Sequence, residues 1–323
     1  MKIRSFTSAV VAAASLALAL TVSGCGGDAS SAAGTLKVGW VVDPCWSQVP
    51  VAADLGYFDE TGVKVDIVPF PTGAAALEAL AGGGVDVATG GDVPTAAAAL
   101  KNPRVRVIAD GARWAEGRFI ARRSAGIDSI DDLAGRRIAV PLGSSAHYFA
   151  TKFLAEANVQ AELVQTGPAE IVTAVTNGDV DAVAVFQPAL AKVVAALGSD
   201  AVQLQGKEKY SQHSLYLTNA DTLSAKQDEL ADFVSALQKA DQPLQDRDPA
   251  ALAAVAKATG LDQELIAGVA EEFTFKTELG PELAADLADR ARWAQSIGRV
   301  PQDAQIPDYN TVIVDSVLAG GNQ

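Results

Sequence analysis

From Leu36 onward, apolar runs of strand type alternate with Ala- and Leu-rich stretches of helical type, and this alternation limits the possible folds most strongly. Such alternation predicts mainly parallel sheets with helices on both faces, which is the α/β class. After Asp221 the pattern changes to helices alone, and we expect these to pack on the first lobe described below. The runs interpreted as strands are Leu36–Val42, Val63–Val68, Val85–Ala88, Val105–Ala109, Phe119–Ala121, Arg137–Val140, Glu162–Val164, Val180–Phe186 and Leu215–Leu217.

The chain also contains an internal repeat. In the first copy a helix begins at Thr72-Gly73 and ends at glycine, a strand that starts Val-Asp follows, and Pro94 begins the next helix. The second copy has the same order of elements from Thr166-Gly167 to Pro188. Glycine suits the left-handed end of a helix, and proline suits the first helical turn. The repeat predicts two lobes of similar build, whose equivalent loops face each other across a ligand cleft at the carboxyl ends of the strands.

The repeat also gives the expected domain boundaries. We assign residues 36–115 and 217–323 to lobe 1 and residues 116–216 to lobe 2. The chain is expected to cross between the lobes around Ala112–Ile120 and again around His213–Thr218.

The N-terminus has the pattern of a secretion signal. Lys2 and Arg4 precede the uncharged apolar run Ala9–Leu20, and small residues follow up to Cys25. This run is too short to span a bilayer comfortably. The series Val-Ser-Gly-Cys resembles a bacterial lipobox, which predicts a signal peptide over 1–24, lipidation of Cys25 and a flexible tether over 25–35. The folded body would then be held on the extracytoplasmic face of the cell membrane.

Composition narrows the function. A formal charge of −14 disfavours nucleic-acid partners. Two cysteines are too few for a disulfide scaffold. One structural zinc site would need all of the cysteines and both histidines, so we expect neither a metal nor a cofactor. Common catalytic motifs are missing, and Ser145 and His147 have an i, i+2 spacing that points them apart on a helix. We therefore expect a binding protein rather than an enzyme.

The most informative segment is a strand that runs into Gly143-Ser144-Ser145, with His147 and Tyr148 just beyond. Ser144 is a suitable N-cap for a helix that begins at Ser145. A helix start offers free N–H groups and a partial positive charge, so it can bind an anion without a basic residue. A plain serine cap without a ligand is the alternative.

The loops that face this helix start supply the other candidate ligand contacts. In lobe 1 these contacts include a flat aromatic side chain, a Gly-rich turn and two carboxylates. Each of the two carboxylates could instead serve only as a helix N-cap. A carboxylate that pointed inward would favour an amine on the ligand. The candidates on this side are Asp43, Trp46, Gln48, Gly91 and Asp92, with Trp114 and Glu116 at the first crossing. In lobe 2 they are Thr166, Phe186 and Gln187, together with His147 on the helix that begins at Ser145.

At these residues the chain resembles the nitrate/sulfonate/taurine family of solute-binding proteins that serve ABC importers, and it is most similar to the taurine/alkanesulfonate branch. The resemblance covers about residues 36–319 in fixed order, and the matching phrases are Asp54–Asp66, Ala79–Ala88, Asp132–Val140, Gly143–Tyr148, Asn177–Ala182, Gly298–Pro301 and Asp308-Tyr309.

The resemblance implies a two-lobed periplasmic-binding-protein fold of type II. Such a protein closes on a small ligand and delivers it to a membrane permease with its ATPase, and we expect a monomer. Ser144 and Ser145 would bind the oxyanion, with Gly91 and Asp92 lining the site.

Several residues depart from the family pattern. The second-lobe strand ends Phe186-Gln187-Pro188 where the family often has a tryptophan. Asp92 stands where small hydroxyl residues are common, and Ser214 stands near the position of an acid in taurine binders. These changes leave the ligand open between sulfonates, taurine and nitrate. The alternatives are a thiamine-precursor pyrimidine or another aromatic solute on Trp46, an enzyme on the same fold, and a purely structural lipoprotein; the iron-binding enzymes among the relatives carry a cysteine-rich motif that this chain lacks.

Overall fold

The computed structural model describes residues 34–319, so the predicted signal peptide, the lipidation site Cys25 and most of the predicted tether lie outside the described residues. The strands are β1 (Thr35–Val41), β2 (Lys64–Phe70), β3 (Val87–Gly91), β4 (Val105–Trp114), β5 (Phe119–Arg122), β6 (Arg137–Val140), β7 (Glu162–Gln165), β8 (Ala182–Ala184), β9 (Ala201–Leu204), β10 (Gln212–Asn219) and β11 (Phe273–Glu278).

The helices occur mostly between these strands, as the sequence predicts. They are α1 (Gln48–Asp54), α2 (Tyr57–Thr61), α3 (Gly73–Ala81), α4 (Asp92–Lys101), α5 (Ser145–Glu156), α6 (Ile171–Asn177), α7 (Ala189–Leu197), α8 (Ala220–Ala225), α9 (Gln227–Gln245), α10 (Pro249–Thr259), α11 (Gln263–Ala270), α12 (Leu283–Ser296) and α13 (Ser316–Ala319); short 3₁₀ turns lie at Pro44–Trp46, Arg123–Ala125, Asp131–Leu133, Gly198–Asp200 and Tyr309–Thr311.

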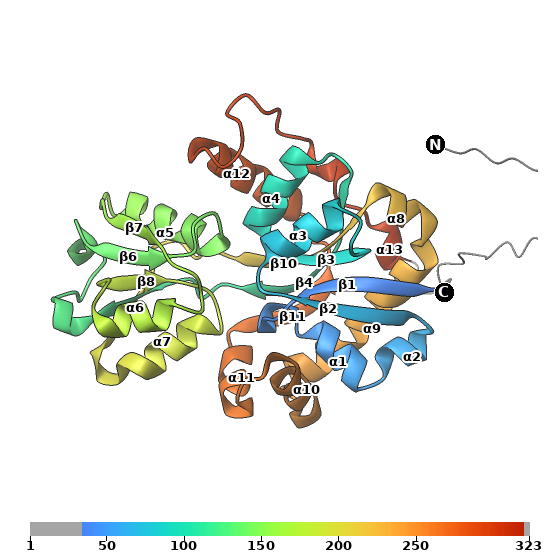
Figure 1. Cartoon of the computed structure of the whole chain (residues 1–323), viewed down its shortest axis with the longest axis horizontal. Coiled ribbons are helices and arrows are strands. Elements are labelled where there is room, and N and C mark those ends of the chain that lie inside the picture. Colours follow the sequence, from blue (N-terminus) through green and yellow to red (C-terminus); the bar gives the residue numbers. More distant parts are fainter. Residues whose placement is uncertain (1–33, 320–323) are drawn as a thin grey trace, which may run out of the picture. The chain divides into compact units, whose positions relative to one another are not determined.

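The strands form two sheets, which confirms the predicted α/β class. The first has the order β11-β4-β10-β3-β1-β2, and the second has the order β7-β6-β8-β5-β9. We call each sheet with its covering helices a lobe, lobe 1 for the six-stranded sheet and lobe 2 for the five-stranded one. Helices α5, α6 and α7 flank the second sheet, as Figure 1 shows.

Both sheets are mixed rather than mainly parallel. In lobe 1 only the β3–β1 and β1–β2 pairs are parallel, and in lobe 2 only β7–β6 and β6–β8 are. The antiparallel pairs involve strands next to the crossings, such as β10, which returns from lobe 2 and inserts between β3 and β4.

The chain passes from one sheet to the other at residues 115–118, between β4 and β5, and returns at residues 205–211, between β9 and β10. The first passage lies inside the predicted crossing. The second comes just before the predicted segment His213–Thr218, which belongs to β10, and the proposed boundary between residues 216 and 217 falls within that strand.

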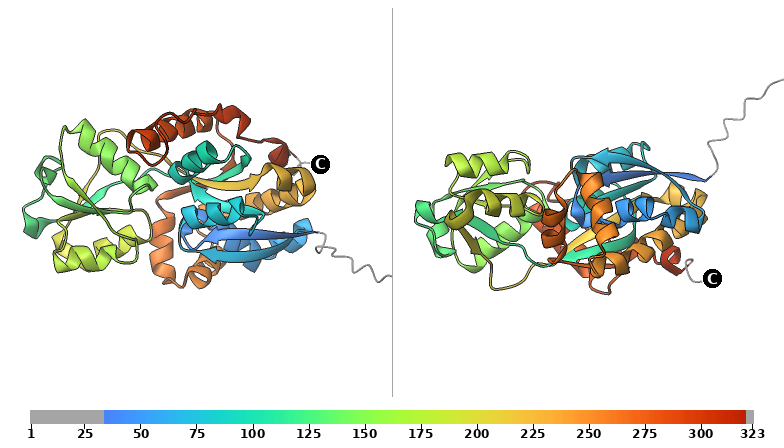
Figure 2. Two further views of the ribbon diagram at one scale, coloured as in Figure 1. Left: turned by 45° about the horizontal axis from the view of Figure 1, so that its top comes forward. Right: turned by 90° about the horizontal axis from the view of Figure 1, so that it is seen from below.

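The C-terminal part contains a strand, so the expectation of helices alone after Asp221 is wrong. In β11 the exposed residues alternate with the buried side chains of Phe273, Phe275 and Thr277, and this strand pairs with β4. A two-residue period over one short run marks a strand, but helices on both sides concealed it. The helices α9 and α13 pack on lobe 1 as predicted, and α12 lies against α4 (Figure 2).

Among residues 34–319, no helix combines the length and the apolar character needed to cross a bilayer.

Candidate functional site

A pocket of about 460 Å³ lies where loops of the two lobes meet. Its walls come from the residues that follow the carboxyl ends of the parallel strands, which is where ligands bind in open α/β sheets. The lobe 1 walls are Val41–Asp43, Cys45-Trp46, Pro71–Ala74, Gly91 and Pro94; the lobe 2 walls are Pro141–Ser145, Gln165, Gly167–Ala169, Val172 and Phe186–Ala189, and Lys192, Gln212 and Arg299 complete the lining.

The start of α5 forms one wall of this pocket. Ser144 is its N-cap: the Ser144 hydroxyl accepts from the Ala146 and His147 N–H groups at 3.1 and 3.4 Å and donates to the Pro141 carbonyl at 2.7 Å. The Ser145 hydroxyl donates to Asp92 Oδ1 at 2.7 Å. Both hydroxyl protons are therefore used within the chain, and the donor that α5 presents to the pocket is the first-turn N–H of Ser145.

Other positive groups line the same pocket. The starts of α3 (at Gly73) and α7 (at Ala189) both face it, and each adds the partial positive charge of a helix N-terminus. Two basic side chains, Lys192 and Arg299, also line it. The Arg299 guanidinium donates to the Leu142 carbonyl at 2.9 Å, which places this cation beside the start of α5. The arrangement favours an anion.

Hydrogen-bond acceptors form a separate part of the lining. Asp43 is 5% exposed, and its Oδ1 accepts from the Cys45 N–H at 2.8 Å. Burial raises the pKa of Asp43 to about 6. Gln212 is 3% exposed, and within the described residues its Oε1 has no hydrogen-bond partner. Burial, together with the charge of Asp43, raises the pKa of the Cys45 thiol, so this cysteine is a poor nucleophile.

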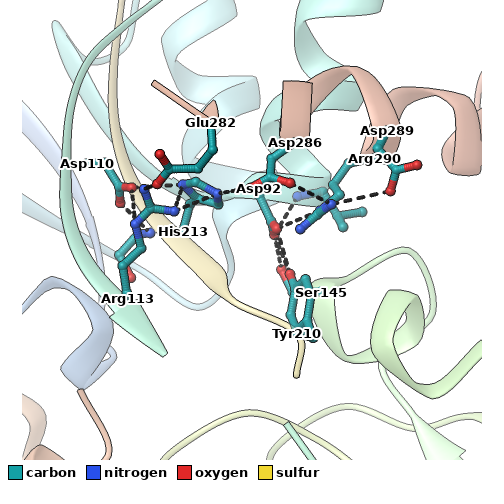
Figure 3. A network of polar contacts seen from close by, with 12 residues as sticks. Asp92, Asp110, Arg113, Ser145, Tyr210, His213, Glu282, Asp286, Asp289 and Arg290 are labelled. Atoms are coloured by element: carbon teal, nitrogen blue, oxygen red, sulfur yellow. Dashed lines mark hydrogen bonds and ion pairs between the residues drawn. The ribbon is translucent and has the colours of Figure 1, made fainter. Parts of the chain in front are cut away.

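Behind the α5 wall, a buried polar network joins the two lobes (Figure 3). Asp92, at the start of α4, is fully buried and accepts from the Tyr210 hydroxyl at 2.6 Å and from Arg290 Nε at 3.1 Å, in addition to the Ser145 hydroxyl. Arg290 on α12 also pairs with Asp286 and Asp289, each at 3.3 Å.

Arg290 holds this network together. Burial is the largest single effect and works to lower its pKa. The neighbouring acidic groups, with Asp92 the strongest, together outweigh burial and raise the pKa above its usual range, so the guanidinium stays charged. Its carbon centre lies 4.6 Å from the ring centre of Tyr148 and 5.2 Å from that of Tyr210. A buried carboxylate beside the pocket is therefore neutralised by an arginine held between two aromatic rings.

The network continues to His213 on β10. Its Nδ1 lies 2.8 Å from Asp110 Oδ2 and its Nε2 lies 3.0 Å from Asp286 Oδ2. Burial works to lower the pKa of His213, but the hydrogen bonds to Asp110 and Asp286 outweigh it and raise the pKa to about 9. Arg113 Nη1 also lies 2.6 Å from His213 Nε2, so the ring faces a cation as well as the two carboxylates. Arg113 Nε, 2.9 Å from Asp110 Oδ2, adds a further positive charge.

A family profile described as "NMT1/THI5 like" matches residues 45–250, more than half of the chain. The chain belongs to the NMT1/THI5-like family. The taurine-binding periplasmic protein of Escherichia coli (strain K12) is 26% identical over 281 residues, which cover 81% of this chain and 86% of that protein. This relative confirms the resemblance found in the sequence.

Solved structures support the two-lobed fold of this NMT1/THI5-like chain. The periplasmic aliphatic sulphonate binding protein SsuA from Escherichia coli matches with a TM-score of 0.75 and 21% identity, covering 87% of this chain and 92% of that one. The desulfurization enzyme DszB is a more distant match, with a TM-score of 0.61 and 16% identity, covering 90% of this chain and 99% of that one. The predicted type II fold is confirmed, and the family's fold also carries enzymes.

The fold brings only some of the predicted site residues to the pocket. Those that line it are Asp43, Trp46, Gly91, Ser144, Ser145, Phe186 and Gln187. Trp46 is 5% exposed, and its Nε1 donates to the Leu215 carbonyl at 3.1 Å, which fixes the ring as part of the wall.

The other predicted residues lie outside the lining and make contacts within the chain. The Gln48 side chain is buried among Gly111, Asp241 and Tyr216. Asp92 belongs to the network described above. The Thr166 hydroxyl donates to the Val164 carbonyl at 3.2 Å.

His147 is also held from within the chain. Its Nδ1 accepts from the Gly143 N–H at 3.0 Å, and its ring packs edge-on against Trp293 at 4.9 Å between centres. Burial, assisted by the charge of Arg299, lowers the pKa of His147 to about 4. A neutral imidazole of this kind stabilises the loop before α5 and carries no charge for the pocket.

Two predicted residues lie at the first crossing. The Glu116 carboxylate pairs with Lys209 at 3.1 Å and accepts from Gln205 at 2.9 Å. Burial works to raise the pKa of Glu116, but these hydrogen bonds lower it overall. The fully buried Trp114 donates through Nε1 to Glu272 Oε2 at 2.8 Å.

Glu272 ties the lobes together at the same crossing. Its Oε1 lies 2.6 Å from Arg118 Nη2, and its Oε2 accepts from Gln187 Nε2 at 2.8 Å. Gln187 thus lines the pocket with part of its surface while its amide connects lobe 2 to the C-terminal part of lobe 1.

Several residues of the site were missed from the sequence. Lys192 lies on the first turn of α7, and its helical register after Pro188 was a usable signal. Arg290 belongs to α12 and Arg299 follows it, and both are far in sequence from the other pocket residues. No local pattern distinguishes these two arginines from basic residues on the surface. Tyr210 lies in the return crossing, where no regular period exists.

Proposed function

We propose that this chain is the extracytoplasmic solute-binding protein of an ABC importer and that it captures a sulfonate-like anion in the pocket between its lobes. The observation that carries the proposal is the convergence of the α5, α3 and α7 starts with Arg299 and Lys192 on one pocket. The names of its relative and of the structurally similar SsuA protein, both periplasmic binding proteins for sulfonated solutes, support it. Binding rather than catalysis is the proposed activity.

The same pocket supports closure on the ligand. Loops of both lobes contact the same space, so a bound anion stabilises the arrangement in which they are close. The segments 115–118 and 205–211 are the two connections about which the lobes can rotate. A permease then distinguishes the closed, loaded protein from the open one.

A thermal-shift panel tests the ligand class. A ligand at about 100 times its Kd stabilises the fold by roughly 2.7 kcal/mol, so a shift of several degrees is expected with a sulfonate. Taurine, alkanesulfonates, a sulfate ester, nitrate and a thiamine-precursor pyrimidine make up the panel. A shift with the pyrimidine alone would replace the sulfonate assignment by the aromatic alternative, and no shift with any anion would overturn it.

A matched pair of variants tests the contact itself. Ser145→Pro removes the N–H that α5 presents to the pocket, and proline is well tolerated at the first position of a helix. The backbone of Ser144 before it is extended, with φ −98° and ψ 174°, which a following proline permits. Ser145→Ala keeps the N–H and removes only the hydroxyl. We expect Ser145→Pro to weaken sulfonate binding about tenfold more than Ser145→Ala; equal affinities would place the anion elsewhere.

We further propose that Cys25 carries the lipid anchor. The lipobox-like series before it supports this part. Cys25→Ala is expected to move the protein from the membrane fraction to the soluble fraction of the cell that makes it, without changing ligand affinity. Membrane retention of the variant would contradict the anchor.

A further inference from the structure

The pocket offers room beyond a ligand of taurine's size. Its volume of about 460 Å³ lies in the range of roughly 300–1,000 Å³ found for pockets that bind drug-sized ligands. A ligand with a ring in addition to its sulfonate belongs to that size class, and taurine is smaller.

The walls are suited to such a ring. Trp46 and Phe186 bring aromatic faces or edges, Leu142 and Val172 add aliphatic surface, and several prolines complete the apolar part. Ligand pockets of this size combine a mainly apolar lining with a few polar groups that fix the orientation. The polar groups here are of two kinds, donors and cations around the α5 start and acceptors at Asp43 and Gln212.

The acceptor atoms of Asp43 and Gln212 receive few hydrogen bonds from within the chain. Within residues 34–319, the donors that reach the Asp43 carboxylate come from Cys45, although a carboxylate accepts several hydrogen bonds. The Gln212 Oε1 has no partner in the same range, and its Nε2 has only the Cys45 sulfur, at 3.6 Å. Buried polar atoms without partners are unfavourable, so these two side chains need a donor from outside the chain.

Asp43 differs in this respect from the other acids that were candidates for an amine contact. Asp92 is neutralised by Arg290 and receives three further hydrogen bonds, two from hydroxyl groups and one from the Val93 N–H. Glu116 is paired with Lys209 away from the pocket. Among the described residues, Asp43 is therefore the carboxylate of the pocket lining that is not paired with a basic side chain.

We propose that Asp43 and Gln212 form a subsite for a cationic, N–H-bearing group of the ligand, and that the ligand is an amino-sulfonate with a ring-sized apolar body. This inference rests on the proposed function, because the sulfonate end of the ligand is taken from it. The ammonium group donates to the Asp43 carboxylate and the Gln212 oxygen, the ring packs between Trp46 and Phe186, and the sulfonate accepts from the start of α5.

Four probes separate the two parts of this ligand. 4-(Aminomethyl)benzenesulfonate and 4-ethylbenzenesulfonate have the same shape, and only the first carries an ammonium group. Taurine and propane-1-sulfonate form the matching small pair. We expect the aminomethyl ring probe to bind most tightly by isothermal titration calorimetry, at least tenfold more tightly than either its ethyl counterpart or taurine.

Asp43→Asn tests the subsite. Asparagine preserves the side-chain oxygen that accepts from the Cys45 N–H, so the fold is retained, which a melting curve verifies. The variant should lose roughly 10- to 100-fold in affinity for the aminomethyl probe and change little for the ethyl probe. Gln212→Met should show the same selectivity with a smaller loss. Glu60→Gln, a carboxylate-to-amide change on the exposed surface of α2, should leave both affinities unchanged.

The outcomes are distinct. If the ethyl probe binds but Asp43→Asn weakens neither probe, or weakens both equally, the subsite is refuted while the proposed function stands. If taurine binds as tightly as the aminomethyl ring probe, the ring-sized body is refuted. If none of the four sulfonates binds the unaltered protein, the proposed function itself has failed.

Discussion

Replacing Arg290 should reveal how much the buried network contributes to stability. Arg290 is 6% exposed and neutralises the fully buried Asp92, so Arg290→Met leaves a carboxylate without its cation in the interior. Removing one partner of a buried ion pair costs about 3–5 kcal/mol, because the other charge stays desolvated. The remaining donors from Ser145 and Tyr210 offset part of this, so we expect the lower end, about 3 kcal/mol.

Guanidinium unfolding followed by circular dichroism measures this change. The control is the double variant Arg290→Met with Asp92→Asn, which removes the uncompensated charge and keeps a hydrogen-bonding side chain. It should be more stable than Arg290→Met alone, which gives a favourable coupling in a double-mutant cycle. The reasoning is wrong if Arg290→Met stays within 1 kcal/mol of the unaltered protein, or if the double variant is as unstable as the sum of the two single changes.

Three further changes follow from the site. The pKa of His213 is about 9 in the folded state and 6.5 in the unfolded state, so the stabilisation by His213 is fully present below pH 6.5 and disappears as the pH rises through 9. The free energy of unfolding should fall by on the order of 3 kcal/mol between these pH values. His213→Gln should flatten this dependence of stability on pH. Ser144→Ala removes the N-cap of α5 and should cost about 1 kcal/mol in chemical denaturation, with Ser144→Asp restoring it. Gly143 has φ +80° and a Cβ there would meet the Arg299 guanidinium, so Gly143→Ala should destabilise by about 1–2 kcal/mol and also weaken sulfonate binding; unchanged melting would show that the loop tolerates a side chain.

Signals that are local in sequence predicted the parts of the fold that local physics decides. The Ser144 cap and the start of α5 at Ser145 follow from neighbouring residues, and the structure has them where the sequence indicated. The same holds for Thr72, whose hydroxyl caps α3. Strand β11 was missed because its two-residue period extends over one short run between helices.

The choice among acidic residues could not be made from the sequence. Asp43 and Asp92 both follow strands and both lie at the start of a helical turn, so their local patterns are similar. What separates them is Arg290, which pairs with Asp92 from 198 positions away and from a helix with no local mark of function. Long-range partners of this kind decide which carboxylate a pocket presents, and only the packed structure contains them.

The Arg290–Asp92 pair also resolves an apparent conflict between the acidic chain and an anionic ligand. The chain carries a formal charge of −14, and Asp92 directly contacts Ser145 at the start of α5. Two like charges about 5 Å apart repel by about 3 kcal/mol at an effective dielectric constant near 20, which would cancel much of what a helix start and two cations contribute. Because Arg290 neutralises Asp92, the field at the pocket is set by the helix starts, Lys192 and Arg299. The proposed anion is therefore attracted locally by a protein whose overall charge repels it. On that proposal, Arg290→Met should weaken sulfonate binding even though Arg290 lies outside the pocket lining.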